Sequence, residues 1–405
     1  MIRFKNTYFF LVYNWLVVLF LFISCTSFTQ NDGSEKIITA SEQTEKYIPM
    51  LKGKKVAIIA NQTTVIERKK GGEFVHLVDS LLALDINIIK VFAPEHGFRG
   101  KADAGEHVSN HKDIKTGLPI ISLYGKNKKP SQEQLSNIDI VVFDIQDVGV
   151  RFYTYISTMT YVMETCAELD IPVILLDRPN PNGHYVDGPT LEIEHKSFVG
   201  MHPIPLVYGM TMGEYAQMVN GEKWMEGNVK CDLTIIRLKN YTHNSEYNLP
   251  IRPSPNLPND QSINLYPSLG FFEGTIINAG RGTEFQFQRY GAPFFHADSS
   301  IEDLTYTPQP NFGSKDPKFK GELCHGVDLS KVEKLSMVNL KWLVDAYHKT
   351  PKDKEFFGNS FTIHAGNIEL QKQIESGKTA KEIRASWQKD VEKFKKVRIK
   401  YLIYD

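Results

Sequence analysis

Polar and titratable side chains stand directly after four of the five apolar runs in the first half of the chain. They are Asn61, Gln62, Glu95, His96, Asp144, Gln146, Asp147, Asp177 and Arg178. Carboxyl groups brought close together have their pKa values pushed apart by burial and mutual repulsion, as acid–base catalysis requires. We therefore predict that Glu95, His96, Asp144 and Asp147 are catalytic and that the others bind substrate.

Each of these motifs also has a structural interpretation. The stretch Ala-Pro-Glu-His-Gly-Phe-Arg-Gly (93–100) could be a solvated turn in which the histidine only orients the glutamate beside it. Asp144 and Asp147 could cap a helix. Asp177 and Arg178 could form a structural ion pair.

Arginines near these motifs favour an anionic substrate, because a guanidinium group binds a carboxylate or phosphate through two hydrogen bonds. The arginines concerned are Arg99, Arg151 and Arg178. Later in the chain stand three more candidates for substrate binding, which are Glu273, Arg281 and Glu284. They could face the same cleft from a second domain, although the glycines around Arg281 could mark only a tight turn.

The elements that would position these residues read as strands alternating with helices. The apolar runs 55–60, 86–92, 119–124, 139–143 and 172–176 are short and nearly continuous, which is typical of parallel strands buried on both faces. Helical patterns separate them, for example at 74–82 and 153–169. We predict an α/β fold with a Rossmann-like, doubly wound, mostly parallel sheet. In such sheets ligands bind at the carboxyl ends of the strands.

The sequence predicts no cofactor. Asn-Gln-Thr-Thr (61–64) follows the first strand, where a dinucleotide-binding protein would have Gly-x-Gly-x-x-Gly. Two Glu-His pairs, at 95–96 and 106–107, could suggest a metal, but no histidine follows at the spacing of a helical zinc motif. Cys166, Cys231 and Cys324 are isolated, so they indicate neither a disulfide framework nor a zinc cluster.

The second half indicates a smaller α+β domain. The segment 250–267 contains five prolines and is predicted not to form regular helix. We place the boundary there, with a catalytic domain at 46–255 and a C-terminal domain at 256–405. An amphipathic helix is expected at 380–396 and a closing strand at 397–403.

The first residues have the pattern of an export signal. Arg3 and Lys5 precede an apolar run at 8–23, and Leu-Phe-Ile-Ser then leads to Cys25 in a sequence that resembles a bacterial lipobox. We predict a signal at 1–25, a lipid on Cys25 and a polar tether at 26–45. The alternative is an uncleaved membrane anchor. Both place the domain outside the cytoplasm and on a membrane.

The charge balance gives no reason to expect nucleic acid as a partner. The 405 residues include 47 Lys and Arg and 47 Asp and Glu, and no basic tail concentrates the positive charge.

Four long motifs together resemble one known family. They are 93–100, Phe-Asp-Ile-Gln-Asp-Val-Gly-Val-Arg-Phe-Tyr-Thr-Tyr (143–155), Leu-Asp-Arg-Pro-Asn-Pro (176–181) and Pro-Ser-Pro-Asn-Leu-Pro (253–258). The chain from about residue 52 to 404 resembles the exo-β-N-acetylmuramidase family NamZ. The resemblance implies a glycoside hydrolase that removes N-acetylmuramic acid from the non-reducing end of peptidoglycan fragments. It also implies a cleft between a Rossmann-like domain and a smaller domain, and Glu95 as the catalytic residue.

The residues agree with this resemblance but leave several points open. Glycosidases generally use two carboxyl groups. Glu95 would be the acid, and the second group could be Asp144, Asp147, Glu273, Glu284 or the 2-acetamido group of the substrate. The lactyl carboxylate of muramic acid would need a cation, which could be Arg99, Arg151, Arg178 or Arg281. A metal-dependent cell-wall hydrolase and a non-catalytic lipoprotein that binds muropeptides remain as alternatives.

Overall fold

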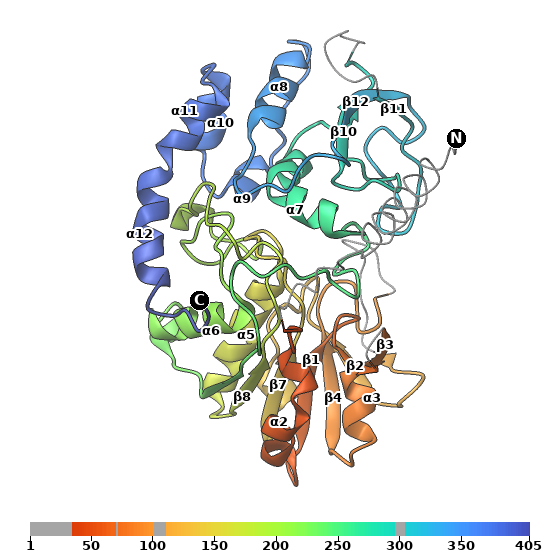
Figure 1. The fold of residues 1–405 in the computed structure, drawn as a ribbon, viewed down its shortest axis with the longest axis vertical. Helices are drawn as coiled ribbons and strands as arrows, with labels where there is room; N and C mark the ends of the chain where they lie inside the picture. Colours follow the sequence, from red (N-terminus) through yellow and green to blue (C-terminus); the bar gives the residue numbers. More distant parts are fainter. Residues whose placement is uncertain (1–34, 70–71, 101–110, 296–303) are drawn as a thin grey trace, which may run out of the picture. The chain divides into compact units, whose positions relative to one another are not determined.

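The computed structural model describes residues 35–69, 72–100, 111–295 and 304–405, and within these ranges the largest element is a seven-stranded sheet (Figure 1). Its strands are β1 (Val56–Ala60), β4 (Ile88–Ala93), β5 (His111–Lys112), β6 (Pro119–Ser122), β7 (Ile140–Asp144), β8 (Val173–Leu176) and β9 (Leu233–Ile236). The order is β5-β6-β4-β1-β7-β8-β9, and every neighbouring pair is parallel except the pair of the edge strand β5 with β6.

This order is that of a Rossmann-like, doubly wound sheet, as predicted. The parallel strands, counted along the chain, lie in the order third, second, first, fourth, fifth, sixth. The strand order reverses between β1 and β7, which pair from Val56 with Ile140 to Ala60 with Asp144. Ligands of such sheets bind in the crevice beyond the strand ends at this switch point.

Helices cover both faces of the sheet and bury two separate cores. On one face α2 (Thr44–Leu51) and α3 (Leu77–Leu82) pack against the side chains of Val56, Ile58 and their neighbours. On the other face α5 (Tyr155–Glu168) and α6 (Met212–Gly221) pack against Ala57 and Ile59. Burial on both faces explains why β1 and β7 read as continuous apolar runs rather than as alternating ones.

The helix predicted at 74–82 begins later than predicted, because residues 74–76 are not helical. Residues 74–76 belong to β3 (Glu73–His76), which pairs with β2 (Val65–Lys69) in an antiparallel hairpin. The helix starts only at Leu77, and the His76 side chain caps it by accepting a hydrogen bond from the Val78 amide at 3.3 Å. Cross-strand pairing therefore overrides the helical spacing of the apolar residues.

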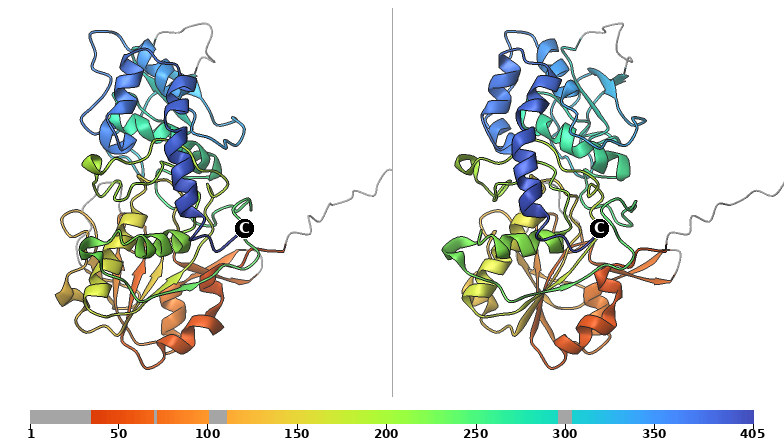
Figure 2. Two further views of the ribbon diagram at one scale, coloured as in Figure 1. Left: turned by 90° about the vertical axis from the view of Figure 1, so that its left-hand side faces the viewer. Right: turned by 60° about the vertical axis from the view of Figure 1, so that its left-hand side comes forward.

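The C-terminal part is α+β. A three-stranded antiparallel sheet contains β10 (Arg289–Ala292), β11 (Leu304–Tyr306) and β12 (Cys324–Asp328). The helices are α7 (Asp260–Leu269), α8 (Lys341–Lys349), α9 (Phe361–Ala365), α10 (Glu369–Glu375), α11 (Ala380–Ser386) and α12 (Gln388–Arg398), as Figure 2 shows from two further sides. Shorter helical turns are α4 (Gln132–Leu135), η1 (Ala40–Glu42), η2 (Ile193–His195), η3 (Glu226–Asn228) and η4 (Gly270–Gly274).

Three predictions for this part are corrected. The proline-rich segment does form a helix, α7, because Asn259 caps its start and Pro267 falls in its last turn, where it removes one hydrogen bond. The predicted strand at 397–403 is absent from the described structure, because α12 continues to Arg398 and the following backbone bonds to side chains instead. The predicted helix at 380–396 is two helices that meet at Trp387.

The last residues bind to the end of β8 and to α6. The Tyr404 hydroxyl donates to Asp177 Oδ2 at 2.8 Å, and the Ile403 amide donates to Glu214 Oε1 at 2.8 Å. Residues 37–405 form one compact unit, so the boundary placed at 255/256 stays a prediction. The signal at 1–25 and Cys25 lie outside the described residues, and no described helix is long and apolar enough to span a bilayer.

Candidate active site

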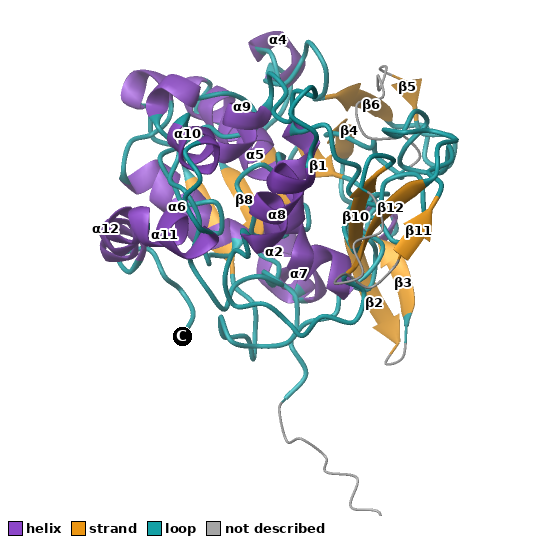
Figure 3. Ribbon diagram, turned by 90° about the horizontal axis from the view of Figure 1, so that it is seen from above, coloured by secondary structure: helices purple, strands orange, loops and turns teal. Residues whose placement is uncertain are grey.

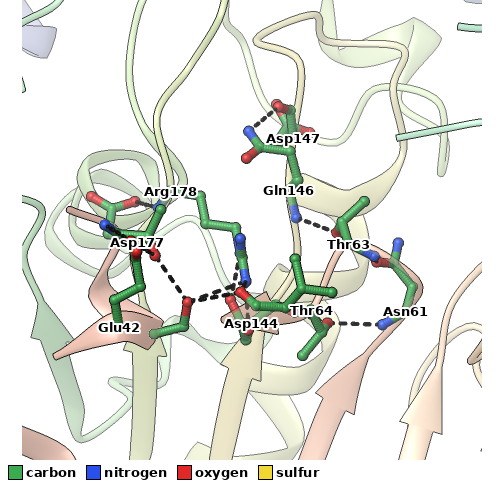
Figure 4. A network of polar contacts seen from close by, with 12 residues as sticks. Glu42, Asn61, Thr63, Thr64, Asp144, Gln146, Asp147, Asp177 and Arg178 are labelled. Atoms are coloured by element: carbon green, nitrogen blue, oxygen red, sulfur yellow. Dashed lines mark hydrogen bonds and ion pairs between the residues drawn. The ribbon is translucent and has the colours of Figure 1, made fainter. Parts of the chain in front are cut away.

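Hydrogen bonds join the loops that follow β1 and β7 at the switch point. Asn61 Oδ1 accepts hydrogen bonds from the amide and the hydroxyl of Thr63 at 2.8 and 2.6 Å (Figure 4). The Thr63 hydroxyl in turn accepts from the Gln146 amide at 3.0 Å. Asn61 and Gln146 are both buried, and the Gln146 side chain donates to the Pro179 carbonyl at 2.6 Å. These two predicted substrate-binding residues therefore build the floor of the crevice.

Glu95 lies on a tight turn immediately after β4, the strand beside β1. The Gly97 amide donates to the Pro94 carbonyl at 3.1 Å, and His96 and Gly97 both have left-handed backbone angles, with φ of 71° and 75°. A positive φ is uncommon for a residue other than glycine and is found at functional turns. The turn leaves the Glu95 side chain partly exposed while His96 is only 4% exposed.

Tyrosines from two distant segments form a cluster beside the Glu95 turn, where the Tyr155 hydroxyl donates to the Glu95 carbonyl at 3.5 Å. Tyr153 and Tyr155 stand at the start of α5, and Tyr266 comes from α7. Their rings pack edge to face, with centroids 4.8 Å apart for Tyr153 and Tyr155 and 6.2 Å apart for Tyr153 and Tyr266. Burial raises the pKa of the Tyr155 and Tyr266 hydroxyls, and the negative charge of Glu95 raises both further. The charge of Glu95 therefore raises the pKa of side chains from both halves of the chain.

Tyr266 also connects Glu95 to a charged cluster in the C-terminal part. The charges of Glu273, Arg281 and Asp147 all act on the pKa of Tyr266. Glu273 accepts from Arg281 Nη1 at 2.6 Å, and each of these side chains is 24% exposed. Burial opposes ionisation of Glu273, but Arg281, Lys318 and His364 outweigh it and hold its pKa below the ordinary value. Glu273 is therefore an ionised carboxylate that Arg281 holds in position.

Asp147 is buried in a different environment. Its Oδ2 accepts from the Tyr208 hydroxyl and, at 2.7 Å, from the Gly149 amide, and the residue is 6% exposed. No described residue bonds to its Oδ1. Burial raises the pKa of Asp147 to about 7, although the hydrogen bonds from Tyr208 and Gly149 oppose this. Asp147 therefore holds a proton far more readily than Glu273 does.

Asp144, Asp177 and Arg178, which were predicted to catalyse or to bind substrate, are buried and bonded to other parts of the protein, as in a structural role. Arg178 Nε and Nη2 donate to the two carboxylate oxygens of Asp144 at 2.6 and 2.8 Å, and both side chains are almost completely buried (Figure 4). Asp177 has no exposed surface and accepts from Thr211, the Gly213 amide and Tyr404. A substrate could not reach these groups without opening the core.

Two more arginines are occupied by the protein itself. Arg99 makes a two-pronged ion pair with Asp113 at 2.8 and 2.7 Å and also reaches Asp79. Arg151 is fully buried and donates to four backbone carbonyls, those of Pro189, Ile204, His364 and Ala365. Neither guanidinium is placed to receive an anionic substrate.

Gln62 and Glu284, the remaining predicted residues, lie at the edge of the crevice and on the surface. Gln62 is partly exposed and donates to the Pro253 carbonyl at 3.0 Å, which also accepts from Tyr153 at 2.7 Å. Glu284 is exposed. The four motifs thus meet at one place, since Pro253 belongs to the fourth of them.

The sequence prediction missed the tyrosines and Lys318. Tyr153 and Tyr155 stood within a motif that was recognised, but tyrosine alone gives no signal for chemistry. Lys318 donates to the carbonyls of Phe272, Thr275 and Ile277, and it stands far from any motif. Among the described residues no group of three or more His, Cys, Asp and Glu side chains could hold a metal ion, and the pair 106–107 lies outside them.

Comparison with known proteins gives consistent matches over most of the chain. Two family models match, "Exo-beta-N-acetylmuramidase NamZ, N-terminal" over residues 56–261 and "Exo-beta-N-acetylmuramidase NamZ, C-terminal" over residues 264–404. A protein of Bacillus subtilis (strain 168) named peptidoglycan beta-N-acetylmuramidase NamZ is 42% identical over 379 residues, which cover 88% of this chain and 89% of that protein.

Two solved structures of DUF1343 family proteins from Bacteroides fragilis NCTC 9343 share the fold. The first has a TM-score of 0.83 and 46% identity, covering 92% of this chain and 99% of that chain. The second has a TM-score of 0.78 and 29% identity, covering 91% and 99%. The similarity therefore extends over nearly the full length of both solved chains.

Proposed function

This chain belongs to the exo-β-N-acetylmuramidase NamZ family, and from that premise we propose that it releases N-acetylmuramic acid from the non-reducing end of peptidoglycan fragments, with Glu95 as the acid–base group. The family resemblance predicted from the four motifs is confirmed. The chain is accordingly a glycosidase, and its substrates are saccharides of peptidoglycan.

The observation that carries the assignment of Glu95 is its place in the site. It follows the strand next to the switch point, its side chain is partly exposed, and its charge acts on hydroxyls of Tyr155 and Tyr266. A general acid must reach the leaving-group oxygen, and a partly exposed carboxyl group at the strand ends can do so. Of these tyrosines Tyr266 is partly exposed, and it can offer an apolar ring face and a polar hydroxyl to a sugar.

The other carboxyl groups of the site are engaged. Asp147 is tied to Tyr208 and Gly149, and Glu273 is tied to Arg281. Asp147 Oδ1 has no partner among the described residues, but the side chain is 6% exposed and burial raises its pKa to about 7, so it is a poor nucleophile. Glu273 is held by Arg281. We therefore assign nucleophilic assistance to the 2-acetamido group of the substrate, a known alternative to a protein nucleophile. Glu95 would donate a proton to the leaving oxygen and later accept one from the attacking water.

Arg281 is the arginine best placed for the lactyl carboxylate. Of the four candidates it is the one whose charge, like that of Glu95, acts on the pKa of Tyr266, whereas Arg99, Arg151 and Arg178 are occupied elsewhere. Glu273 fixes one end of its guanidinium group, and the Gly313 carbonyl accepts from Nη2 at 3.1 Å. A fixed guanidinium loses little freedom on binding a carboxylate.

We also propose that the chain is exported and held on a membrane by a lipid on Cys25. The pattern of residues 1–25 supports this, and it suits a protein that acts on cell-wall material. Metabolic labelling with a fatty-acid analogue should mark the full chain and should not mark a Cys25→Ser variant. Labelling that persists in the variant would contradict the proposal, and an unlabelled protein that stays in the membrane would support an uncleaved anchor instead.

The function is tested by hydrolysis of a chromogenic β-N-acetylmuraminide by the full chain in EDTA, beside the matching N-acetylglucosaminide. We expect release from the muraminide only. The Glu95→Gln variant should lose about 10²–10⁴-fold in kcat or more, as is typical when an acid–base group is removed. Glu133→Gln, which changes an exposed glutamate on α4, is the matched control and should be fully active.

Each other outcome points to a different function. Loss of activity in EDTA would favour a metal-dependent hydrolase. Tight binding of muropeptides without turnover, unaffected by Glu95→Gln, would favour a binding lipoprotein. Equal activity of Glu95→Gln and Glu133→Gln would remove Glu95 from the chemistry.

A further inference from the structure

A cavity lies on the flank of the molecule that carries α12. Its volume is about 410 Å³, and its walls come from α10, from the segment 386–397 that includes most of α12, and from the loops around residues 189–192 and 222–224. In Figures 1 and 3 α12 lies on the opposite side from β4 and from the sheet β10–β12, where Glu95 and Arg281 are found. None of the residues assigned to the active site lines this cavity.

Aromatic side chains held in fixed positions line the cavity. Trp387 is 5% exposed, and its indole Nε1 donates to Asp187 Oδ1 at 2.9 Å. Trp224 stacks on His202 with ring centroids 5.1 Å apart, and Phe394 is also buried. Rings that are already immobilised lose little freedom when a ligand packs on them.

Carboxylates outnumber cations around these rings. Glu192, Glu222, Glu369 and Asp390 line the cavity together with a single lysine, Lys393. Asp390 is paired with Lys393 at 2.7 Å, and Glu222 accepts from Tyr401 at 2.7 Å and lies 3.4 Å from Lys400. The side chains of the remaining two, Glu192 and Glu369, are exposed, and neither makes a hydrogen bond or ion pair with another residue that the structure describes.

The two unpaired carboxylates stand on segments that are bonded to each other. The Glu192 amide donates to the Gly366 carbonyl at 2.8 Å, and Gly366 ends α9 just before α10 begins at Glu369. The two carboxylates therefore lie on connected segments at the rim of the cavity, and the aromatic rings form part of its wall.

We propose that this cavity binds a primary ammonium group at the end of an aliphatic chain. The faces of aromatic rings attract cations through the ring quadrupole. The negative charges of Glu192 and Glu369 balance the positive charge of the ammonium group. A volume of about 410 Å³ matches an amino-acid-sized ligand and falls within the usual range of ligand pockets. This step rests on the proposed function. We take the ammonium group to be that of the diamino acid in the peptide stems of peptidoglycan, which binds here while the sugar that is hydrolysed binds at the active site.

The inference is tested by co-sedimentation of the full chain with purified peptidoglycan whose stem amines are free or have been acetylated. We expect the chain to bind the untreated polymer and to lose about tenfold in affinity for the acetylated one. The double variant Glu192→Gln/Glu369→Gln should show the same loss on untreated polymer. Its kcat/KM on the small chromogenic muraminide should be unchanged, because neither residue lies in the active site.

The matched control is Glu194→Gln/Glu375→Gln, which removes the same charge from two exposed glutamates that do not line the cavity. Equal binding of the two polymers together with no binding of 1,5-diaminopentane, or equal binding by the two double variants, would overturn the proposal. Binding of 1,5-diaminopentane without any difference between the polymers would overturn the stem as the source of the ammonium group. Failure of the proposed function would appear separately, as absence of muraminide hydrolysis by the unmodified chain.

Discussion

Arg178 closes a two-pronged ion pair on Asp144 across the carboxyl edge of the main sheet, with Nε–Oδ1 and Nη2–Oδ2 distances of 2.6 and 2.8 Å. The pair joins the last residue of β7 to the residues that follow β8, and Arg178 Nη2 also donates to the Val65 carbonyl at 3.1 Å. Both side chains are at most 3% exposed. The pair therefore holds three segments next to the crevice in one arrangement.

Removal of one member of this pair should destabilise the fold strongly. We expect Arg178→Ala to lower the free energy of unfolding by about 3–5 kcal/mol, because a buried carboxylate is left without its partner. The double variant Asp144→Leu/Arg178→Met should be less destabilised than Arg178→Ala, since no buried charge remains. Chemical denaturation measures both.

The exposed pair Lys395–Glu392, at 2.8 Å on α12, is the control, and Lys395→Ala should change stability by only about 0.5 kcal/mol or less. A cost of Arg178→Ala no larger than that of Lys395→Ala would show that the buried pair contributes nothing to stability.

Asp147 should make stability depend on pH. Its pKa is about 7 in the folded protein and close to the ordinary 3.8 in the unfolded chain. Between these values the unfolded chain releases a proton that the folded protein keeps, so stability is fully present below about pH 4 and declines as pH rises to about 7. At 1.36 kcal/mol per pKa unit the loss is on the order of a few kcal/mol.

The variant Asp147→Asn cannot ionise and keeps an oxygen for Tyr208 and Gly149. We expect its Tm to exceed that of the parent at pH 8 and to match it at about pH 4, as measured by thermal unfolding. Asp353→Asn, which changes an exposed carboxylate, should show no such trend. A Tm difference that is the same at both pH values would mean that Asp147 is ionised in the folded protein throughout.

The strands that position the site could be predicted because each is buried on both faces. β1 and β7 appear in the sequence as unbroken apolar runs, and their polar C-terminal neighbours mark the crevice. The hairpin β2–β3 could not be predicted in the same way, because Phe74 and Val75 fit a helical spacing as well as a strand. The tail after Arg398 alternates like a strand, yet its partners are the side chains of Glu214 and Asp177.

The residues of the candidate site also differ in how far the sequence alone predicts them. Glu95 can be proposed from the sequence because its motif is local in the chain. The ion pairs of Arg99 and Arg178 cannot be predicted in this way, because their partners Asp113 and Asp144 come from other segments and a sequence does not show which charges meet. Tyr266 and Lys318 likewise reach the site only through the packing of the C-terminal part.

Arg281 should determine selectivity for muramic acid. We expect Arg281→Gln to lower kcat/KM for the muraminide by roughly 10–100-fold, because a charged hydrogen bond to the lactyl carboxylate is lost. Any slow hydrolysis of the glucosaminide, which has no lactyl group, should be unchanged. Comparison of the two substrates separates recognition from damage to the site.

The conservative variant Arg281→Lys should restore part of the muraminide activity, since it keeps the charge but not the two-pronged geometry. An equal loss on both substrates would assign Arg281 to positioning of Glu273 rather than to recognition.

The configuration of the released sugar should be retained. Attack by the 2-acetamido oxygen inverts the anomeric carbon once, and attack by water inverts it again, so the first product has the β configuration of the substrate. Nuclear magnetic resonance during the first minutes of hydrolysis distinguishes the β from the α anomer before they interconvert. Direct attack by a water molecule activated by Asp147 or Glu273 would instead give the α anomer first, and that result would remove the assignment of the acetamido group as nucleophile.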